Sequence, residues 1–322
     1  MKDVRFCLEI WGTDYEKIKQ TCLLAEELGY YGFYYGESLT EIDLDCWTVL
    51  SSLIPITNKI KLGPVITYIL PDYRSLALLV KQSITFQDIS NGRLELRTGA
   101  GASLEYSIQW WYPFGINYSN ASKRVALFNE GISLLSKLMG ISDMNYSQSR
   151  SSTSIANFDG KFFKIHGASF VKPKIRIPLT IAAKQDKMMK IAANYGDVWE
   201  CSYLSPNEFF TLNEKFERLS RKAENIEVSE KSQNRVVKRS IELDVIIASN
   251  EQELDYKKKV FAMERGPGVY DQILKKGLVG NCAEIRARIQ EYMNLGINQF
   301  FLAFQDPFDL NSIELFMDAV KS

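Results

Sequence analysis

Hydrophobic and polar positions along the chain form two alternating patterns. Short runs rich in β-branched and aromatic residues predict buried strands, and most are followed by apolar residues at a spacing close to 3.6, which is typical of amphipathic helices. The predicted strands are 4–11, 30–35, 60–68, 94–98, 178–183, 198–203, 236–248 and 299–304. The predicted helices are 14–28, 43–54, 75–89, 124–139, 188–194, 206–224, 283–295 and a C-terminal segment.

Eight strands that alternate with helices over 322 residues predict a (β/α)8 barrel, a TIM barrel, as one domain over 1–322. A doubly wound sheet is the alternative. Insertions at about 141–170 and 250–280 interrupt the alternation. The Ser- and Asn-rich stretch 141–157 lacks periodicity and is predicted to be a loop, whereas 250–276 is highly charged. Because the active site of such a barrel lies at the C-terminal ends of its strands, the residues that follow each strand are the candidates.

Charge and composition exclude several classes of protein. Lys plus Arg and Asp plus Glu both number 39, so the net charge is zero, which disfavours binding to nucleic acid or to an acidic membrane. No apolar run is long enough to span a bilayer, and charges near the N-terminus disfavour a signal peptide. The single histidine, His166, excludes a multi-histidine metal site, and we expect it on the surface. Five scattered cysteines predict reduced thiols in the cytoplasm: Cys7, Cys22, Cys46, Cys201 and Cys282.

The third predicted strand contains Gly63 and Pro64. Proline cannot donate a ladder hydrogen bond, so we expect a bulge or a local break there. At a strand end that faces a ligand, such a bulge can press backbone atoms against a flat ring. A simple irregularity at the strand edge is the alternative.

The fourth strand ends in Arg97-Thr98-Gly99-Ala100-Gly101. Glycine permits close approach of the backbone to a ligand, although a plain tight turn fits equally well. Glu95 and Arg97 share one strand face. If that face is internal, they need charged partners such as Glu9, Glu37 or Glu200, and an internal ion-pair layer is favoured over a catalytic role. Downstream, the aromatic residues 110–112 either roof an apolar pocket or only pack the loop.

Residues 181–187 join a strand to a helix. A helix N-terminus presents free N–H groups that suit a phosphate, and Lys184 and Lys187 would add positive charge. The alternative is an ordinary helix start with Asp186 as the cap.

Together these segments resemble the luciferase-like superfamily of flavin- and deazaflavin-dependent oxidoreductases. The matching stretches, in order, are 25–30 leading to Gly36-Glu37-Ser38, then 61–67, then 91–94 leading to 99–101, and 177–183 leading to 192–199. The resemblance implies a (β/α)8 barrel that holds FMN or the deazaflavin coenzyme F420 at its C-terminal mouth. Dimers are common in the family, so a homodimer is one expectation.

The resemblance also implies roles for individual residues. A non-proline cis peptide bond at Val65–Ile66 would back the cofactor ring, and Glu37 and Thr67 would lie beside it. The remaining cofactor-binding residues would be Gly99, Ala100 and Gly101 at the strand-four turn and Ala183, Lys184, Gln185 and Lys187 at the phosphate. Glu37, Ser38 and Glu105 are the candidate proton carriers of catalysis.

Three departures from the family pattern narrow the expected activity. Ser38 stands where a histidine often follows the strand-two acid, and Ala102 stands where deazaflavin-dependent sugar-phosphate dehydrogenases have a glutamate. Ala100 replaces an arginine of bacterial luciferase. We therefore expect hydride transfer or monooxygenation of another small organic substrate. The alternatives are a cofactor-binding protein without turnover and an unrelated barrel lyase or isomerase that uses Lys184 as its amine.

Overall fold

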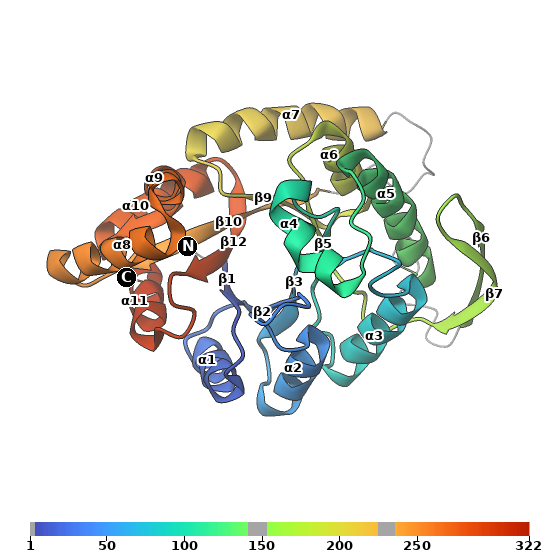
Figure 1. Cartoon of the computed structure of the whole chain (residues 1–322), viewed down its shortest axis with the longest axis horizontal. Coiled ribbons are helices and arrows are strands. Elements are labelled where there is room, and N and C mark those ends of the chain that lie inside the picture. The colour runs from blue at the N-terminus through green and yellow to red at the C-terminus, as the bar shows by residue number, and fades with distance from the viewer. Residues whose placement is uncertain (1–3, 141–152, 225–235, 322) are drawn as a thin grey trace.

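The computed structural model describes residues 4–140, 153–224 and 236–321. Helices surround a central sheet (Figure 1). The strands are β1 (Arg5–Ile10), β2 (Gly32–Gly36), β3 (Lys61–Val65), β4 (Thr67–Tyr68), β5 (Leu96–Gly99), β6 (Thr153–Asp159), β7 (Lys164–Val171), β8 (Leu179–Ala182), β9 (Val198–Ser202), β10 (Lys238–Ile247), β11 (Leu278–Gly280) and β12 (Ile297–Phe304). The helices are α1 (Tyr15–Glu27), α2 (Cys46–Leu53), α3 (Leu76–Ile89), α4 (Leu104–Trp111), α5 (Ala121–Leu138), α6 (Asp186–Tyr195), α7 (Pro206–Glu224), α8 (Glu251–Arg265), α9 (Pro267–Lys276), α10 (Cys282–Asn294) and α11 (Leu310–Lys321).

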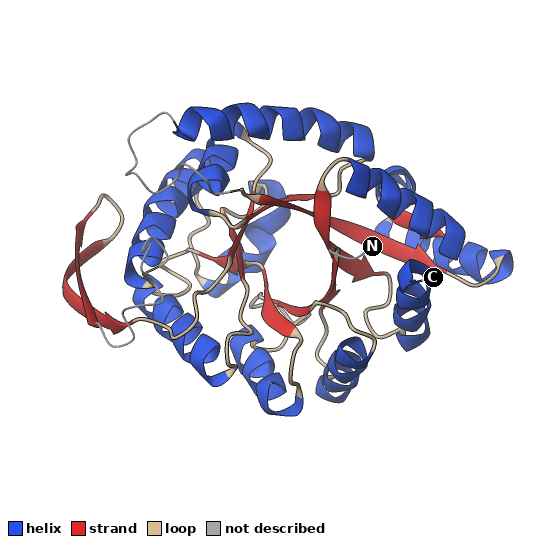
Figure 2. Ribbon diagram, turned by 180° about the vertical axis from the view of Figure 1, so that it is seen from behind, coloured by secondary structure: helices blue, strands red, loops and turns tan. Residues whose placement is uncertain are grey.

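The central sheet is the predicted barrel. Its hydrogen-bonded strand order is β3-β2-β1-β12-β10-β9-β8-β5-β4, and every neighbouring pair is parallel. Only Ile66 separates β3 from β4, so the two ends of this order are consecutive halves of one strand, and a bridge between Leu62 and Leu94 joins β3 to the segment that leads into β5. Counted this way, eight strands of the described chain form the barrel. Figure 2 shows from the opposite side that the strands enclose the centre. The (β/α)8 prediction is confirmed.

Successive residues of a barrel strand face the interior and the helices in turn. In β2, Phe33 and Tyr35 belong to the main core, which lies largely between the sheet and the helices. Tyr34 instead lies inside the barrel with Cys7 and Phe301, and its ring meets that of Phe301 edge-on at 5.0 Å between centroids. Gly32, Tyr34 and Gly36 therefore share the interior face of β2.

The second helix begins later than the sequence indicates. The predicted range was 43–54, but α2 starts at Cys46, because Asp45 is its N-cap and accepts a hydrogen bond from the Thr48 backbone N–H at 2.8 Å. Such a cap stabilises a helix start by about 1 kcal/mol. Asp43 is consequently left in the loop between β2 and α2.

The first insertion contains a hairpin rather than only a loop. β6 and β7 pair antiparallel, and Figure 1 shows the hairpin beside the barrel rather than in its wall. The loop prediction for 141–157 is therefore wrong at 153–157, and 141–152 lie outside the described residues. A hairpin with one exposed face needs few apolar residues, so its sequence carries a weak signal. His166 is exposed on β7, as expected.

The second insertion also has regular structure. It forms α8, α9 and β11, and apolar residues of these helices, including Phe261 and Ile273, pack against Ile246 of β10. The helix α4, which the sequence did not predict, follows the strand-four turn. Among the described residues, no helix combines the length and apolarity needed to cross a bilayer.

Candidate active site

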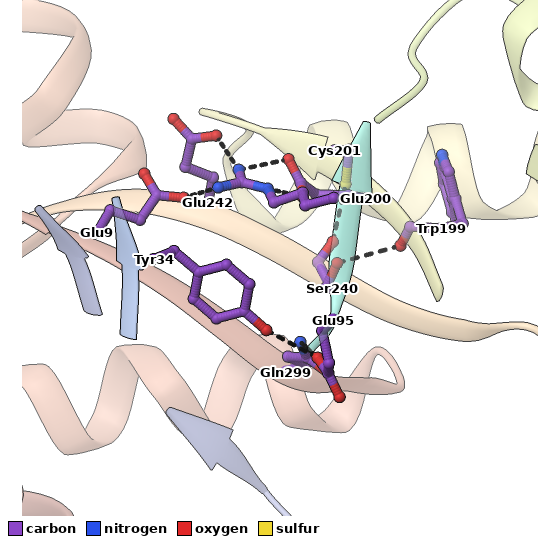
Figure 3. A network of polar contacts seen from close by, with 10 residues as sticks. Glu9, Tyr34, Glu95, Trp199, Glu200, Cys201, Ser240, Glu242 and Gln299 are labelled. Carbon is purple, nitrogen blue, oxygen red and sulfur yellow. Dashed lines mark hydrogen bonds and ion pairs between the residues drawn. The ribbon is translucent and has the colours of Figure 1, made fainter. Parts of the chain in front are cut away.

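A fully buried arginine joins four strands of the barrel. Figure 3 shows the polar network to which its partners Glu9, Glu200 and Glu242 belong. Arg97 of β5 binds Glu200 through two nitrogens and reaches Glu242 of β10 at 2.5 Å and Glu9 of β1 from Nη1. Its guanidinium also lies over the Phe301 ring, 4.1 Å from the centroid. The expected internal ion-pair layer therefore exists with Glu9 and Glu200. Glu242 was not identified from the sequence as a partner, although a glutamate inside the mainly apolar run 241–247 indicates a buried charge.

This cluster holds three carboxyl groups and one guanidinium. Burial raises the pKa of Glu9 well above its usual value and also raises that of Glu200, while Arg97 acts in the opposite direction on both. If all three carboxyls were ionised, the buried cluster would carry a net charge of −2, which a low-dielectric interior disfavours. The centre of the barrel therefore favours retention of a proton at neutral pH.

Glu95 forms a separate network nearer the N-terminal end of β5. Tyr34 donates to its Oε2 at 2.7 Å, Tyr31 donates to Oε1, and the Gln299 amide lies 3.5 Å from Oε2. Glu37 takes no part in either network, so the expectation that it balances the charge of Glu95 or Arg97 is wrong. It follows the end of β2, too far along the strand to reach them.

At the barrel mouth, Glu37 has its own cation. Its Oε1 forms an ion pair with Arg74 and accepts a hydrogen bond from the Tyr73 hydroxyl at 3.1 Å. The Arg74 guanidinium lies over the Trp47 ring, 5.5 Å from the centroid. The other oxygen, Oε2, is buried without a hydrogen-bond partner. Sequence reasoning missed Tyr73 and Arg74, although both lie in the short segment between β4 and α3.

The other predicted proton carriers differ in position. Ser38 donates to Oδ2 of Asp43 at 2.8 Å and lies 3.0 Å from the Thr40 hydroxyl. Glu105 is exposed in the first turn of α4. Asp43 is another residue that the sequence did not single out.

The third barrel strand has a cis peptide bond at Val65–Ile66, the position that the resemblance implies. Val65 packs against the interior cluster of Cys7, Tyr34 and Phe301. Thr67, directly after the break, is fully buried, and its Oγ1 has no hydrogen-bond partner. The strand therefore brings a buried, unpartnered hydroxyl to the mouth.

An aromatic wall stands beside this strand. Trp111 at the end of α4 is buried against Tyr68, Tyr73 and Tyr118, with ring centroids 4.9, 5.1 and 6.2 Å away. Its Nε1 is buried without a partner. Trp111 thus packs the loops together and, at the same time, provides an unpartnered donor next to β4.

The strand-four turn is fixed by residues of the next segment. Gly101 has φ +84°, and a Cβ there would lie 2.2 Å from the Tyr118 hydroxyl, so only glycine fits. Arg124 donates to the carbonyls of Ala100 at 3.0 Å and Ala102 at 2.6 Å. The sequence did not identify Arg124, which lies at the predicted start of a helix. Gly99 has ordinary space around it.

The predicted phosphate loop lies where β8 meets α6. Ala183 is buried, whereas Lys184, Gln185 and Lys187 are exposed. Gln185 occupies the N-cap position, and no side chain caps the helix, so its first backbone N–H groups are available. The alternative with Asp186 as the cap is wrong, because its carboxylate pairs with Lys215 at 2.5 Å.

A cavity of about 630 Å³ opens beside the ends of β10 and β12. Its walls include Trp11, which follows β1, and Tyr256 and Arg265 of α8. Asp244, nearby on β10, has its pKa raised to about 7, mainly by burial and by Glu242, while Arg265 lowers it. The second insertion therefore contributes a wall of this cavity.

Unpartnered polar atoms gather at one side of the mouth. Among the described residues, five such buried atoms belong to side chains around the ends of β2, β3 and β4: Glu37 Oε2, Asp43 Oδ1, Trp47 Nε1, Thr67 Oγ1 and Trp111 Nε1. A buried polar atom without a partner destabilises a protein by about 1–3 kcal/mol, and a bound water, an ion or a ligand can supply the missing partner.

The family model for luciferase-like monooxygenases matches residues 11–257. This match includes the mouth residues just described and more than half of the chain. The chain belongs to the luciferase-like monooxygenase family.

The chain is also similar to a curated relative and to solved structures. A 5,10-methylenetetrahydromethanopterin reductase of Archaeoglobus fulgidus is 26% identical over 203 residues, which cover 63% of this chain and 54% of the relative, so the chain spans about half of its length. The solved F420-dependent secondary alcohol dehydrogenase superposes with a TM-score of 0.76 at 17% identity, covering 99% of this chain and 100% of that one. The monooxygenase RslO1 of Streptomyces bottropensis gives 0.73 at 18% identity, covering 98% of each chain. These structural similarities show the shared barrel fold.

Proposed function

We propose that the chain is an oxidoreductase that uses a reduced flavin or, as the preferred cofactor, the deazaflavin coenzyme F420. The group of five unpartnered buried polar atoms at the mouth carries the proposal, because a ring edged with hydrogen-bond donors and acceptors would satisfy them. Family membership supports the flavin class. The names of the methanopterin reductase and of the alcohol dehydrogenase support the deazaflavin.

The residues present fit such a cofactor. The Thr67 hydroxyl and the Trp111 indole N–H are buried without partners, and Trp111 belongs to the aromatic wall against which a flat ring would pack. The uncapped start of α6, with Lys184 beside it, suits the cofactor phosphate. When bound, the cofactor supplies hydride chemistry, and the protein orients it and excludes water. The cavity beside Trp11 and α8 is the proposed site for the substrate.

Absorbance titrations test this proposal. Purified protein is titrated separately with F420 and with FMN, and the reduced form of whichever binds is then mixed with a panel of ketones and imines. We expect saturable binding of F420 and oxidation of its reduced form by at least one substrate. Binding of neither coenzyme would contradict the proposal, and binding without turnover would favour a cofactor-binding protein.

A pair of lysine variants locates the phosphate. Lys184→Met should weaken cofactor binding about tenfold, which corresponds to about 1.4 kcal/mol. Lys190→Met is the matched control, because Lys190 is exposed further along the same helix. Equal affinity of both variants would place the phosphate elsewhere.

A further inference from the structure

We propose that the Asp43 carboxyl group supplies the proton that accompanies hydride transfer at this mouth. This inference rests on the proposed function and adds a catalytic residue to it. It differs from the roles expected for Glu37, Ser38 and Glu105.

Asp43 occupies a place that β2 leaves empty. Gly36, the last residue of β2, faces the barrel interior in line with Tyr34. A Cβ at Gly36 would lie 2.6 and 2.8 Å from the two carboxylate oxygens of Asp43. The loop after β2 therefore turns back and places a carboxyl group where the strand itself has no side chain.

This position lies between the ends of two other strands. Gly36 is in register with Val65, which precedes the cis peptide bond of the third strand. Asp43 also forms an isolated parallel bridge with Gly12, two residues beyond β1 and next to the cavity-lining Trp11. Asp43 therefore lies next to the segment that follows β1, one residue of which lines the proposed substrate cavity, and its carboxyl group lies against Gly36 at the level of Val65.

Only one of the two Asp43 oxygens has a side-chain partner. Ser38 donates to Oδ2 at 2.8 Å, whereas Oδ1 is buried and has no side-chain partner. We assign Ser38 as a positioning residue, because its hydroxyl fixes one oxygen and leaves the other for a ligand. A carboxyl oxygen that is buried and free is suited to give a proton to a bound substrate.

The surroundings of Asp43 favour the protonated form. Burial raises its pKa, although the hydrogen bonds from Ser38 and from the Gly12 backbone lower it. Among the described residues, no ion pair includes Asp43. The titratable groups that face it are Tyr35, whose hydroxyl bonds the Gly12 carbonyl, and Cys46, whose thiol bonds the Tyr35 carbonyl. Glu9, the interior carboxyl of β1, is bound by Arg97.

The predicted proton carriers are less suited to this role. One oxygen of Glu37 is paired with Arg74, and a guanidinium favours the ionised carboxylate. Ser38 is itself a donor to Asp43, and Glu105 is exposed at the start of α4. Asp43 alone among these residues combines a free buried oxygen with the absence of a paired cation in the described chain.

The proposed step is balanced as follows. Reduction of a substrate C=O or C=N bond takes a hydride at carbon, with its two electrons, from the reduced flavin or deazaflavin. The heteroatom takes the proton from Asp43, and the Asp43 O–H bond breaks to leave a carboxylate. Water returns the proton after product release. In the oxidative direction the same carboxylate accepts the proton of the alcohol.

Asp43→Asn tests the role, with Asp45→Asn as the matched control. Asp45 lies in the same loop, and asparagine is an equally good N-cap, so the control removes a charge without disturbing α2. We expect kcat to fall about 100-fold in Asp43→Asn with KM and cofactor affinity nearly unchanged, and the rate of Asp45→Asn to stay at the wild-type level. Ser38→Ala should shift the pH profile of kcat rather than abolish turnover.

Thermal unfolding gives a second readout that needs no cofactor. The folded-state pKa of Asp43 is raised above its unfolded value, so its favourable contribution is present below about pH 4 and is lost as pH rises through the folded pKa. The Tm of Asp43→Asn minus the Tm of the wild type should therefore increase from pH 4 to pH 8, because only the wild type loses stability as the carboxyl group ionises.

The outcomes separate this inference from the proposed function. If Asp43→Asn keeps the kcat and the pH profile of the wild type, the role of Asp43 is overturned and the proposed function stays intact. A constant Tm difference for Asp43→Asn shows an ordinary ionised carboxylate and also overturns the role. Failure of the wild type to bind either coenzyme overturns the proposed function, and the role falls with it.

Discussion

Arg97 at the centre of the barrel and Glu37 at its mouth are both buried charged residues, but their surroundings differ. Arg97 binds three carboxyl groups from three other strands. Glu37 has one paired oxygen and one without a partner, and it lies beside four other side chains with unpartnered atoms. Complete pairing is the mark of a structural network, whereas incomplete pairing indicates a place where a ligand completes the site.

The largest effect should come from breaking the central network. Arg97→Met leaves Glu9, Glu200 and Glu242 buried without a cation and should lower the free energy of unfolding by about 3–5 kcal/mol. The loss should shrink at low pH, where the carboxyl groups are protonated. Urea denaturation at several pH values measures it. The surface ion pair of the partly exposed Arg288 gives the control: Arg288→Met should lose less than about 1 kcal/mol, and an equal loss in both variants would contradict the comparison.

A smaller loss is expected at the mouth pair. Arg74→Met leaves Glu37 buried and unpaired and should destabilise the protein by about 3 kcal/mol. Glu37→Gln in the same chain should recover part of the loss, because the amide carries no charge. A double-mutant cycle in urea measures the coupling between the two residues. Strictly additive single effects would mean that the two side chains do not interact.

A still smaller effect is expected at Thr67. Its substitution should raise the stability of the protein but weaken cofactor binding, and this combination distinguishes a ligand site from a buried polar atom that simply lacks a partner. Thr67→Val removes a buried hydroxyl without a partner and should stabilise the cofactor-free protein by about 1 kcal/mol. The same change should weaken cofactor binding about tenfold. Thr21 is a second buried, unpartnered threonine in α1, away from the mouth, so Thr21→Val should stabilise similarly and leave binding unchanged. Calorimetry measures both quantities, and equal binding losses would contradict the assignment.

The smallest effect is expected at the only histidine. His166 is exposed on the β6–β7 hairpin, so His166→Gln should change the free energy of unfolding by less than about 0.5 kcal/mol and leave turnover unchanged. Thermal unfolding and a rate assay check this. A change above about 1 kcal/mol would show that the hairpin has a structural role that its exposure hides.

The barrel could be predicted from the sequence because its strands are short, strongly apolar and separated by helical periodicity. Glu9 and Glu200 could be proposed as partners of Arg97, since all three interrupt such strands. The hairpin strand Thr153–Asp159 could not be predicted from the sequence, because a strand outside the core has few apolar residues and hence no clear hydrophobic pattern. The helix α4 was not predicted for a related reason, since a helix of eight residues is too short to show a periodic pattern.

The mouth was predictable in position but not in its pairings. Which strands end there follows from topology, and Val65–Ile66 and Gly101 could be named from the resemblance. The Glu37–Arg74 pair depends on how two loops fold back over the barrel, which no local pattern records. Asp43 was hidden for a further reason, because it reads as the start of a helix that in fact begins after the Asp45 cap.

Thermal unfolding with and without coenzyme tests most directly whether the unpartnered mouth atoms form a cofactor site. F420 or FMN at about 100 times its Kd should stabilise the wild-type chain by about 2.7 kcal/mol, and the shift at the same concentration should be smaller for Thr67→Val than for Thr21→Val. An unchanged Tm of the wild type with both coenzymes at saturating concentrations would contradict the assignment of this mouth as a flavin-type site.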